Sequence, residues 1–321
     1  MPYKSENFKM DLRKTFTPSK DIWSISGYSV CAPNTESVTG VNGCFSPPFA
    51  APDLTFGIEF TANDHIVPDT GTNAKDDCGL LFSGGDWLPE KIVRRGTYHW
   101  MVKEERLVSF AVESEMTPLF SVSGFAVKVS VKSRIDELKI SLAPLVSAGY
   151  PSLVSLDDWE FTPPKPSKNK ANKISEGIWE NDQVRATLFC EADEQIIKNG
   201  ETHDFYFAVI FTKAGESAGK FEITKMIGQS HVRWQKLIAL ASDKLPTIKS
   251  DIPGLKAYFN RSVLSGLVSI WENDAFITNP FPATSGVDGG SICCYPWDVA
   301  GYSAQTLVML FGEKSLDFFK A

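Results

Sequence analysis

The chain has 321 residues, of which 43% are hydrophobic and 12% aromatic, so it can bury a large core in one or two domains. It carries 32 basic and 39 acidic residues, a net charge of -7, and this excess of acid argues against a nucleic-acid or anionic-membrane partner. We therefore expect a neutral or polar ligand.

The N-terminus shows no secretory signal, because charged residues interrupt the place where a run of roughly 7 to 15 apolar residues is required. No segment has the apolar length of a membrane span. The six cysteines are few for this length, and Cys293 and Cys294 are adjacent, so a disulfide framework is not favoured. Neither the cysteines nor the four histidines have metal-ligand spacing. These features favour a cytoplasmic protein without a metal or cofactor.

Residues 1–215 have the pattern of strands. Residues 54–60 and 125–132 alternate between apolar and polar side chains, as strands with one buried face do. Further strand-like runs lie at 22–31, 78–83, 91–103, 105–113, 135–142, 184–190 and 203–212. This pattern predicts a large antiparallel β-sandwich. Residues 205–211 are apolar on both faces and are expected in the middle of a sheet, whereas 161–175, with three prolines and four lysines, is expected to be an exposed loop.

Helical periodicity begins at residue 216 and predicts a helix that continues to residue 242, followed by a loop at 243–250. A second helix is expected to begin near Asp251 and Pro253, and a third to run from about Asp298 to Phe311. Gly312 should end the third helix, and residues 314–321 should begin another. The predicted domains are a sandwich at 1–215, a linker helix and loop at 216–250, and helical hairpins at 251–321.

One motif of nucleophilic catalysis occurs, Gly-Glu-Ser-Ala-Gly at 215–219, and it lies between a strand and a helix as a nucleophile elbow does. The elbow needs a histidine later in the chain, and His231 on the following helix cannot fold back onto Ser217. A turn at a domain boundary is therefore the better interpretation. A serine hydrolase that acts through Ser217 is a further alternative. It predicts that an active-site serine reagent labels Ser217, and we expect no such labelling.

The stretch 285–302 is the best candidate for a ligand site. It is rich in glycine and contains Asp288, Tyr295, Trp297 and Asp298 just before a helical pattern. Aromatic faces stack on the apolar side of a sugar ring, and carboxylates accept hydrogen bonds from its hydroxyl groups, so these residues indicate a carbohydrate. Asp298 has a purely structural alternative as the N-cap of the helix.

The order of a β-sandwich, a linker helix and helical hairpins, with a glycine-rich loop running into Tyr295-Pro-Trp297-Asp298, resembles the six-hairpin glycosidases. These (α/α)6-barrel enzymes include glucoamylases, trehalases, α-rhamnosidases and disaccharide phosphorylases, and several carry an N-terminal β-supersandwich. The motif resemblance covers about residues 251–321, and the order of domains extends it loosely to the whole chain.

The resemblance implies a glycoside hydrolase in which Asp298 holds sugar hydroxyls in the cleavage subsite, beside Trp297. Tyr295 and Asp288 are nominated from their chemistry alone. An inverting enzyme of this kind uses two carboxyl groups about 6.5 to 9.5 Å apart, and neither is assigned to a residue of this chain. Only 71 residues remain from Asp251 to Ala321, whereas twelve helices need about 140, so we expect only the start of the barrel and leave open whether the chain is truncated at Ala321.

Two other functions remain open besides hydrolysis. One is a non-catalytic carbohydrate-binding or assembly protein, in which residues 251–321 form an appendage on the sandwich. The other is a disaccharide phosphorylase. A carbohydrate is the expected partner in each case, and the apolar faces of helices 254–271 and 298–311 would be covered by further helices or by a second copy in a homo-oligomer. The sequence does not specify the sugar or the linkage.

Overall fold

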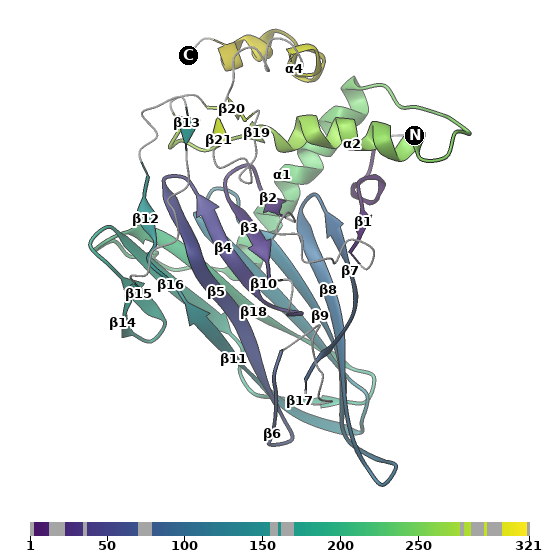
Figure 1. Cartoon of the computed structure of the whole chain (residues 1–321), viewed down its shortest axis with the longest axis vertical. Coiled ribbons are helices and arrows are strands. Elements are labelled where there is room, and N and C mark those ends of the chain that lie inside the picture. The colour runs from purple at the N-terminus through teal and green to yellow at the C-terminus, as the bar shows by residue number, and fades with distance from the viewer. Residues whose placement is uncertain are drawn as a thin grey trace.

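The computed structural model describes residues 3–12, 23–34, 37–69, 79–154, 160–161, 170–276, 279–283, 292–293 and 304–319. Two large antiparallel sheets pack face to face and form the lower part of the molecule in Figure 1, with the helices at one end of them. The fold is therefore mainly a β-sandwich followed by helices, as the sequence predicted.

The first sheet contains nine strands within the described residues. In their order across the sheet they are β1 (Met10–Asp11), β7 (Leu81–Leu88), β8 (Lys91–Val102), β9 (Glu105–Pro118), β10 (Gly124–Ser133), β18 (Thr202–Lys213), β16 (Val184–Glu191), β15 (Ile178–Glu180) and β14 (Asn172–Ser175). The long β8–β9 hairpin extends to the end of the sandwich opposite the helices (Figure 1).

The second sheet has a main path of six strands: β17 (Gln195–Lys198), β11 (Glu137–Ser147), β5 (Phe49–Ala62), β4 (Val41–Ser46), β3 (Val30–Pro33) and β2 (Ser24–Ile25). Two further strands, β6 (His65–Val67) and β12 (Ser152–Leu153), pair with β5. Two short pairs complete the described strands: β13 (Glu160–Phe161) with β21 (Ile292–Cys293), and β19 (Ile270–Trp271) with β20 (Phe281–Pro282).

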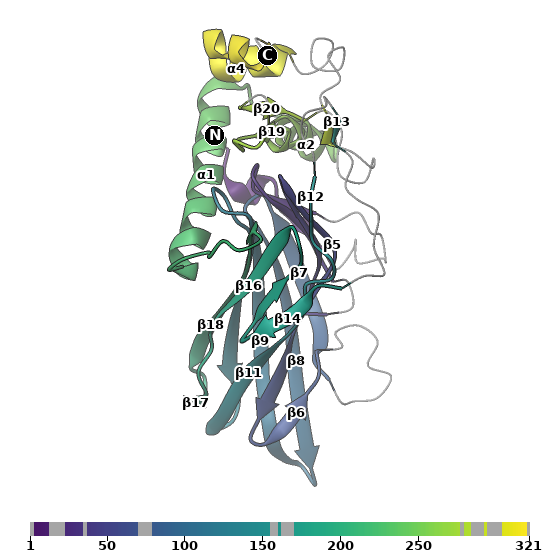
Figure 2. The same cartoon turned by 90° about the vertical axis from the view of Figure 1, so that its left-hand side faces the viewer.

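The described helices are η1 (Ser5–Asn7), α1 (Ile223–Lys244), α2 (Leu255–Val268), α4 (Ala304–Phe311) and η4 (Gly312–Phe319). In Figure 2, α1 runs along one side of the molecule from the sandwich to α4, and α2 crosses above the end of the sheets. Gly312, with φ of 57°, ends the α-helical geometry of α4, and the chain continues directly as a 3₁₀-helix. The predicted end of this helix is confirmed, while residues 298–303 of its predicted start lie outside the described residues.

The interior of the sandwich follows the alternation seen in the sequence. Phe125, Val127, Val129 and Val131 of β10 are fully buried, whereas Lys128 and its alternate neighbours reach the other face. Aromatic rings join the two sheets, since the ring centroid of Phe56 lies 5.8 Å from that of Phe125. Side chains from the inner face of each sheet therefore meet and form the core of the sandwich.

Strand β18 lies between β10 and β16, so its predicted central position is confirmed. Phe205 and Phe207 point into the sandwich core. Ala208 and Ile210 point to the other face, where they pack in a small cluster with Ile223 at the start of α1. The strand is apolar on both sides because the helix covers its outer face at this end.

Helix α1 joins the core of the sandwich through one long side. Trp234, Leu237, Ile238 and Ala241 are buried in the same apolar cluster as the strands. Trp234 is 1% exposed, and its indole Nε1 donates a hydrogen bond to the Ile25 carbonyl oxygen at 3.0 Å. The sandwich and the helical layer therefore share one continuous core.

The structure differs from the sequence prediction in several details. The strand expected at 22–31 is a hairpin of β2 and β3, because Gly27, with φ of 78°, turns the chain between them. The loop expected at 161–175 ends in β14, an edge strand whose side chains are all exposed. The second helix begins at Leu255 rather than near Asp251, after a turn that ends at Gly254 with φ of 81°.

The three cysteines whose side chains are described, Cys31, Cys44 and Cys190, are free thiols. Cys31 and Cys44 face each other across β3 and β4, and burial raises the pKa of both thiols. No helix within the described ranges combines the length and apolar character needed to cross a membrane.

Candidate functional site

The four nominated residues, Asp288, Tyr295, Trp297 and Asp298, all lie outside the described residues. Two residues within their stretch are described, and they form strand β21. Cys293 pairs with Glu160 and Ile292 with Phe161, antiparallel to β13. The middle of the candidate loop is thus held by the chain segment that follows the sandwich strand β12.

The segment that leads into this loop is anchored on the sandwich by a second apolar cluster. Its buried members are Val30, Phe45, Ala50, Trp271, Phe276 and Ala283. Trp271 packs against Phe276 with ring centroids 5.9 Å apart, and Phe276 stacks on Phe281 at 4.5 Å. Because these aromatic rings bury much area, the hairpin of β19 and β20 has a fixed position on the end of the sheet.

Asn273 ties the same segment to two turns of the sandwich. Its side chain is buried, and its Nδ2 donates hydrogen bonds to the carbonyl oxygens of Tyr28 at 3.2 Å and Pro47 at 2.9 Å. Its Oδ1 accepts a bond from the backbone N–H of Ala275 at 2.9 Å. A buried amide with its groups satisfied in this way specifies one arrangement of the turns, since any shift would leave polar atoms unpaired.

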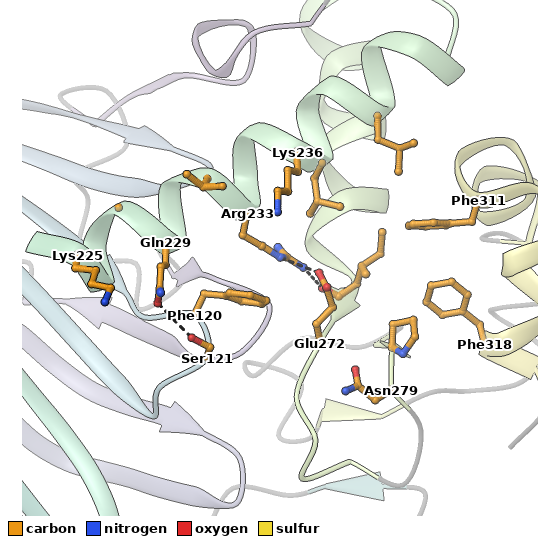
Figure 3. Close-up of a pocket in the computed structure, with 16 residues that line it drawn as sticks. Phe120, Ser121, Lys225, Gln229, Arg233, Lys236, Glu272, Asn279, Phe311 and Phe318 are labelled. Carbon is orange, nitrogen blue, oxygen red and sulfur yellow. Dashed lines mark hydrogen bonds and ion pairs between the residues drawn. The ribbon is translucent and has the colours of Figure 1, made fainter. Parts of the chain in front are cut away.

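A cavity of about 850 Å³ lies between α1 and this anchored segment. Figure 3 shows side chains from α1 on one side, Phe120 and Ser121 from the β9–β10 turn on another, and Phe311 and Phe318 from the last two helices opposite. Asn279 and Pro280 complete the wall, directly before β20. We call this cavity the α1 groove. Residues on both sides of the candidate loop therefore line it.

An ion pair lies in the middle of the α1 groove. Arg233 is 5% exposed, and its Nε donates to Glu272 Oε1 at 3.1 Å (Figure 3). Its Nη2 donates to the Ile270 carbonyl oxygen at 2.6 Å. Burial lowers the pKa of the Arg233 guanidinium to about 10, although the carboxylate of Glu272 opposes the shift. Arg233 nevertheless stays charged near neutral pH.

The guanidinium is also fixed by rings and by the backbone. It lies 5.6 Å from the ring centroid of Phe120 and 5.2 Å from that of Trp234, distances at which cation–π attraction operates. The Nη2 end of the guanidinium lies against Gly27, and the backbone N–H of Glu272 donates to the Gly27 carbonyl oxygen at 2.7 Å. The charge of Arg233 is therefore held in one place before any ligand arrives.

None of the charged residues of the α1 groove was nominated from the sequence. Their shared signal was the spacing of polar side chains on α1, since 225, 229, 233 and 236 follow one side of the helix. The helical pattern was interpreted only through its apolar side. Glu272 could not be found without the structure, because nothing in the sequence shows that it meets Arg233, 39 residues earlier.

The motif at 215–219 forms an exposed turn, as the sequence analysis favoured. Gly215 and Gly219 have φ of 80° and 67°, and Ser217 Oγ accepts a hydrogen bond from the Gly219 N–H at 3.2 Å. His231 lies instead beside Tyr3 and Glu90, in a separate small pocket. Within the described residues, no group of three or more His, Cys, Asp or Glu side chains could hold a metal ion.

No family model matches the sequence, and no curated protein matches it. Among solved structures, the chain is similar to one whose name gives it as a candidate kojibiose phosphorylase from human microbiome. The identity is 10% and the TM-score 0.47, over 84% of this chain and 43% of that chain. This chain thus spans less than half the length of that structure.

Proposed function

We propose that this chain is the sandwich and first helical part of a carbohydrate-active enzyme that cleaves glycosidic bonds. In this proposal Asp298 binds sugar hydroxyls, Trp297 and Tyr295 pack on the ring, and Asp288 adds a second carboxylate. The observation that carries the proposal is the anchoring of the candidate loop. Its preceding segment is fixed on the sandwich by Asn273, its middle pairs with Glu160–Phe161, and α4 follows it.

A loop tied at these points can present aromatic and acidic side chains in one place, which sugar binding requires because each hydroxyl must meet a partner at a set distance. Water and inorganic phosphate are the two attacking groups open to such an enzyme. The first gives a hydrolase and the second a phosphorylase, and the sugar pocket that we propose serves either.

The binding proposal is tested by calorimetry of the chain with a panel of disaccharides. We expect one disaccharide to bind, and Asp298→Asn or Trp297→Ala to weaken its affinity by at least about tenfold, or 1.4 kcal/mol. The matched control is Asp251→Asn, which removes an exposed carboxylate outside the loop. Equal affinities for Asp298→Asn and the control would contradict the role of Asp298.

The reaction is tested by product analysis with and without inorganic phosphate. Free monosaccharides alone indicate hydrolysis, and a sugar phosphate that forms only with phosphate indicates phosphorolysis. For the complete enzyme, we expect Asp298→Asn to remove most of the turnover while the circular dichroism spectrum stays unchanged. If the complete protein binds a sugar but cleaves no linkage, the non-catalytic alternative is favoured.

A further inference from the structure

The α1 groove has an excess of positive charge that the sugar pocket does not explain. Its lining contains three cations, Lys225, Arg233 and Lys236, and one acid, Glu272. Both lysines are exposed, and neither forms an ion pair with another described residue. The whole chain has a net charge of -7, so a groove with two uncompensated positive charges is a local reversal of sign. Such a cavity attracts anions.

Arg233 gives this charge a fixed centre. Of the guanidinium nitrogens, only Nε donates a hydrogen bond to Glu272. The Glu272 side chain is 42% exposed, so water screens the negative charge of its carboxylate. Arg233 Nη1 is buried and has no hydrogen-bond partner among the described residues. Because Nη1 is buried, it adds positive potential to the groove rather than a hydrogen bond to a ligand.

The spacing of the cations along α1 indicates where an anion would bind. Lys225 and Lys236 are eleven residues apart, or about 16 Å along the axis, too far for one small group to touch both. Arg233 and Lys236 are three residues apart and lie on the same side of α1, as Figure 3 shows. The strongest positive field therefore lies at Arg233 and Lys236, with the Lys236 ammonium free to donate to an anion.

The wall next to this point is apolar. Leu237 and Leu240 of α1, together with Phe311 and Phe318, continue the groove beyond Lys236. The rings of Phe311 and Phe318 are 5.3 Å apart, and both face the groove in Figure 3. An aromatic pair of this kind offers a surface for the flat or C–H side of a ring.

We propose that the α1 groove binds a phosphate ester of a small ring-containing molecule, as a site separate from the sugar pocket of the loop. The phosphate, with a charge of roughly -1.5 to -2, accepts hydrogen bonds from Lys236 in the field of Arg233, and the ring packs on Phe311 and Phe318. Lys225 lies at the far end of the groove, beyond the reach of this ligand.

The test uses the full chain and three probes: glucose 6-phosphate, glucose, and inorganic phosphate, each titrated by calorimetry. We expect glucose 6-phosphate to bind most tightly, inorganic phosphate to bind more weakly, and glucose not to bind in the groove. Raising the salt concentration from about 50 to about 500 mM should weaken binding, because the groove is open and its charges are screened. Binding of the phosphate ester that is unaffected by salt would overturn the proposal.

Two variants locate the anion. Lys236→Met keeps the side-chain stem and removes the charge, and it should lower the affinity for glucose 6-phosphate by at least about tenfold. The control is Lys256→Met, which removes an exposed lysine from α2, outside the groove. Both variants should fold normally, since each lysine is exposed. Equal affinities for the two variants would contradict the assignment.

A third variant separates this proposal from the proposed function. Asp298→Asn should weaken disaccharide binding and leave the affinity for glucose 6-phosphate unchanged. Loss of both affinities would mean that one pocket serves both ligands and that the α1 groove is not a separate site. Two sites are supported if Lys236→Met loses phosphate-ester binding but keeps disaccharide binding, and Asp298→Asn keeps phosphate-ester binding.

Discussion

Gly27 is the residue on which the arrangement of Arg233 depends most directly. It turns the chain between β2 and β3 with φ of 78°, where a side chain would be strained. A Cβ at this position would lie 2.2 Å from Arg233 Nη2. The bare backbone therefore lets the guanidinium pack against the turn while the Gly27 carbonyl oxygen accepts the bond from Glu272.

We expect Gly27→Ala to lower the free energy of unfolding by about 3 kcal/mol, from backbone strain and from displacement of Arg233. The control is Gly200→Ala, where φ is 81° and nothing lies within 4 Å of an added Cβ. That variant should cost only the strain, about 1 kcal/mol. Urea unfolding of both proteins measures the difference. Equal losses of unfolding free energy in the two variants would show that the guanidinium can move aside without destabilising the fold.

His231 is the residue that links stability to pH near neutrality. Burial lowers the pKa of its imidazole, and the nearby Lys91 ammonium lowers it further, while Glu90 and Glu115 oppose the shift. Its Nε2 is buried without a hydrogen-bond partner among the described residues. Protonation of the ring in the folded protein is therefore unfavourable.

Because the folded pKa lies below the unfolded value, the unfolded chain takes up the proton first as the pH falls. We expect the free energy of unfolding to decrease as the pH drops from about 7 through the ordinary histidine pKa of about 6.5. In His231→Gln this decrease should be smaller, and the part that remains includes His99, whose pKa burial also lowers. Urea unfolding at a series of pH values gives the slope, and an unchanged slope in the variant would exclude His231 as its source.

At the scale of the element, α1 connects the core to the groove, because one of its sides packs in the core and another lines the α1 groove. One side carries Trp234 and Ile238 into the core, and the other carries the cations of the α1 groove. The sandwich fixes the rotation of the helix through the bond from Trp234 to the Ile25 carbonyl oxygen. The positions of Lys225 and Lys236 follow from that rotation, since a helix has one angular setting for all its side chains.

We expect Trp234→Phe to lower the free energy of unfolding by roughly 1 to 3 kcal/mol, because the Ile25 carbonyl oxygen loses its donor and the smaller ring leaves space. The control is Val232→Ala on the same helix, whose side chain is 46% exposed and which should change the stability by less than about 0.5 kcal/mol. Thermal unfolding followed by circular dichroism compares them. A Trp234→Phe protein as stable as the control would mean that α1 is held mainly by its other apolar contacts.

At the scale of the whole molecule, the sandwich and the helices share one apolar core that reaches from Phe60 in the second sheet through Trp234 to Leu307 in α4. Some apolar side chains of the helical layer stay exposed, with Tyr258 at 72%, Val308 at 52% and Leu316 at 55%. A homo-oligomer that covers them remains a prediction of the sequence.

The sequence by itself determined the sandwich, because alternation along a strand shows directly which side chains are buried. The runs at 125–132 and 203–212 predicted β10 and β18 to within a few residues. It also determined α1, whose apolar side repeats at helical spacing. Short strands such as β2, β14 and β17 were missed or merged, since two to four residues carry too little pattern to be recognised.

Only the tertiary structure decided where the charges meet. Arg233 and Glu272 pair because Gly27 leaves room for the guanidinium and because Asn273 fastens the segment after α2 to the sandwich. Spacing within one element predicts its neighbours on that element, whereas contacts between distant segments depend on how the elements pack. The sequence therefore pointed to the loop that holds Asp298, whereas the α1 groove became visible only in the fold.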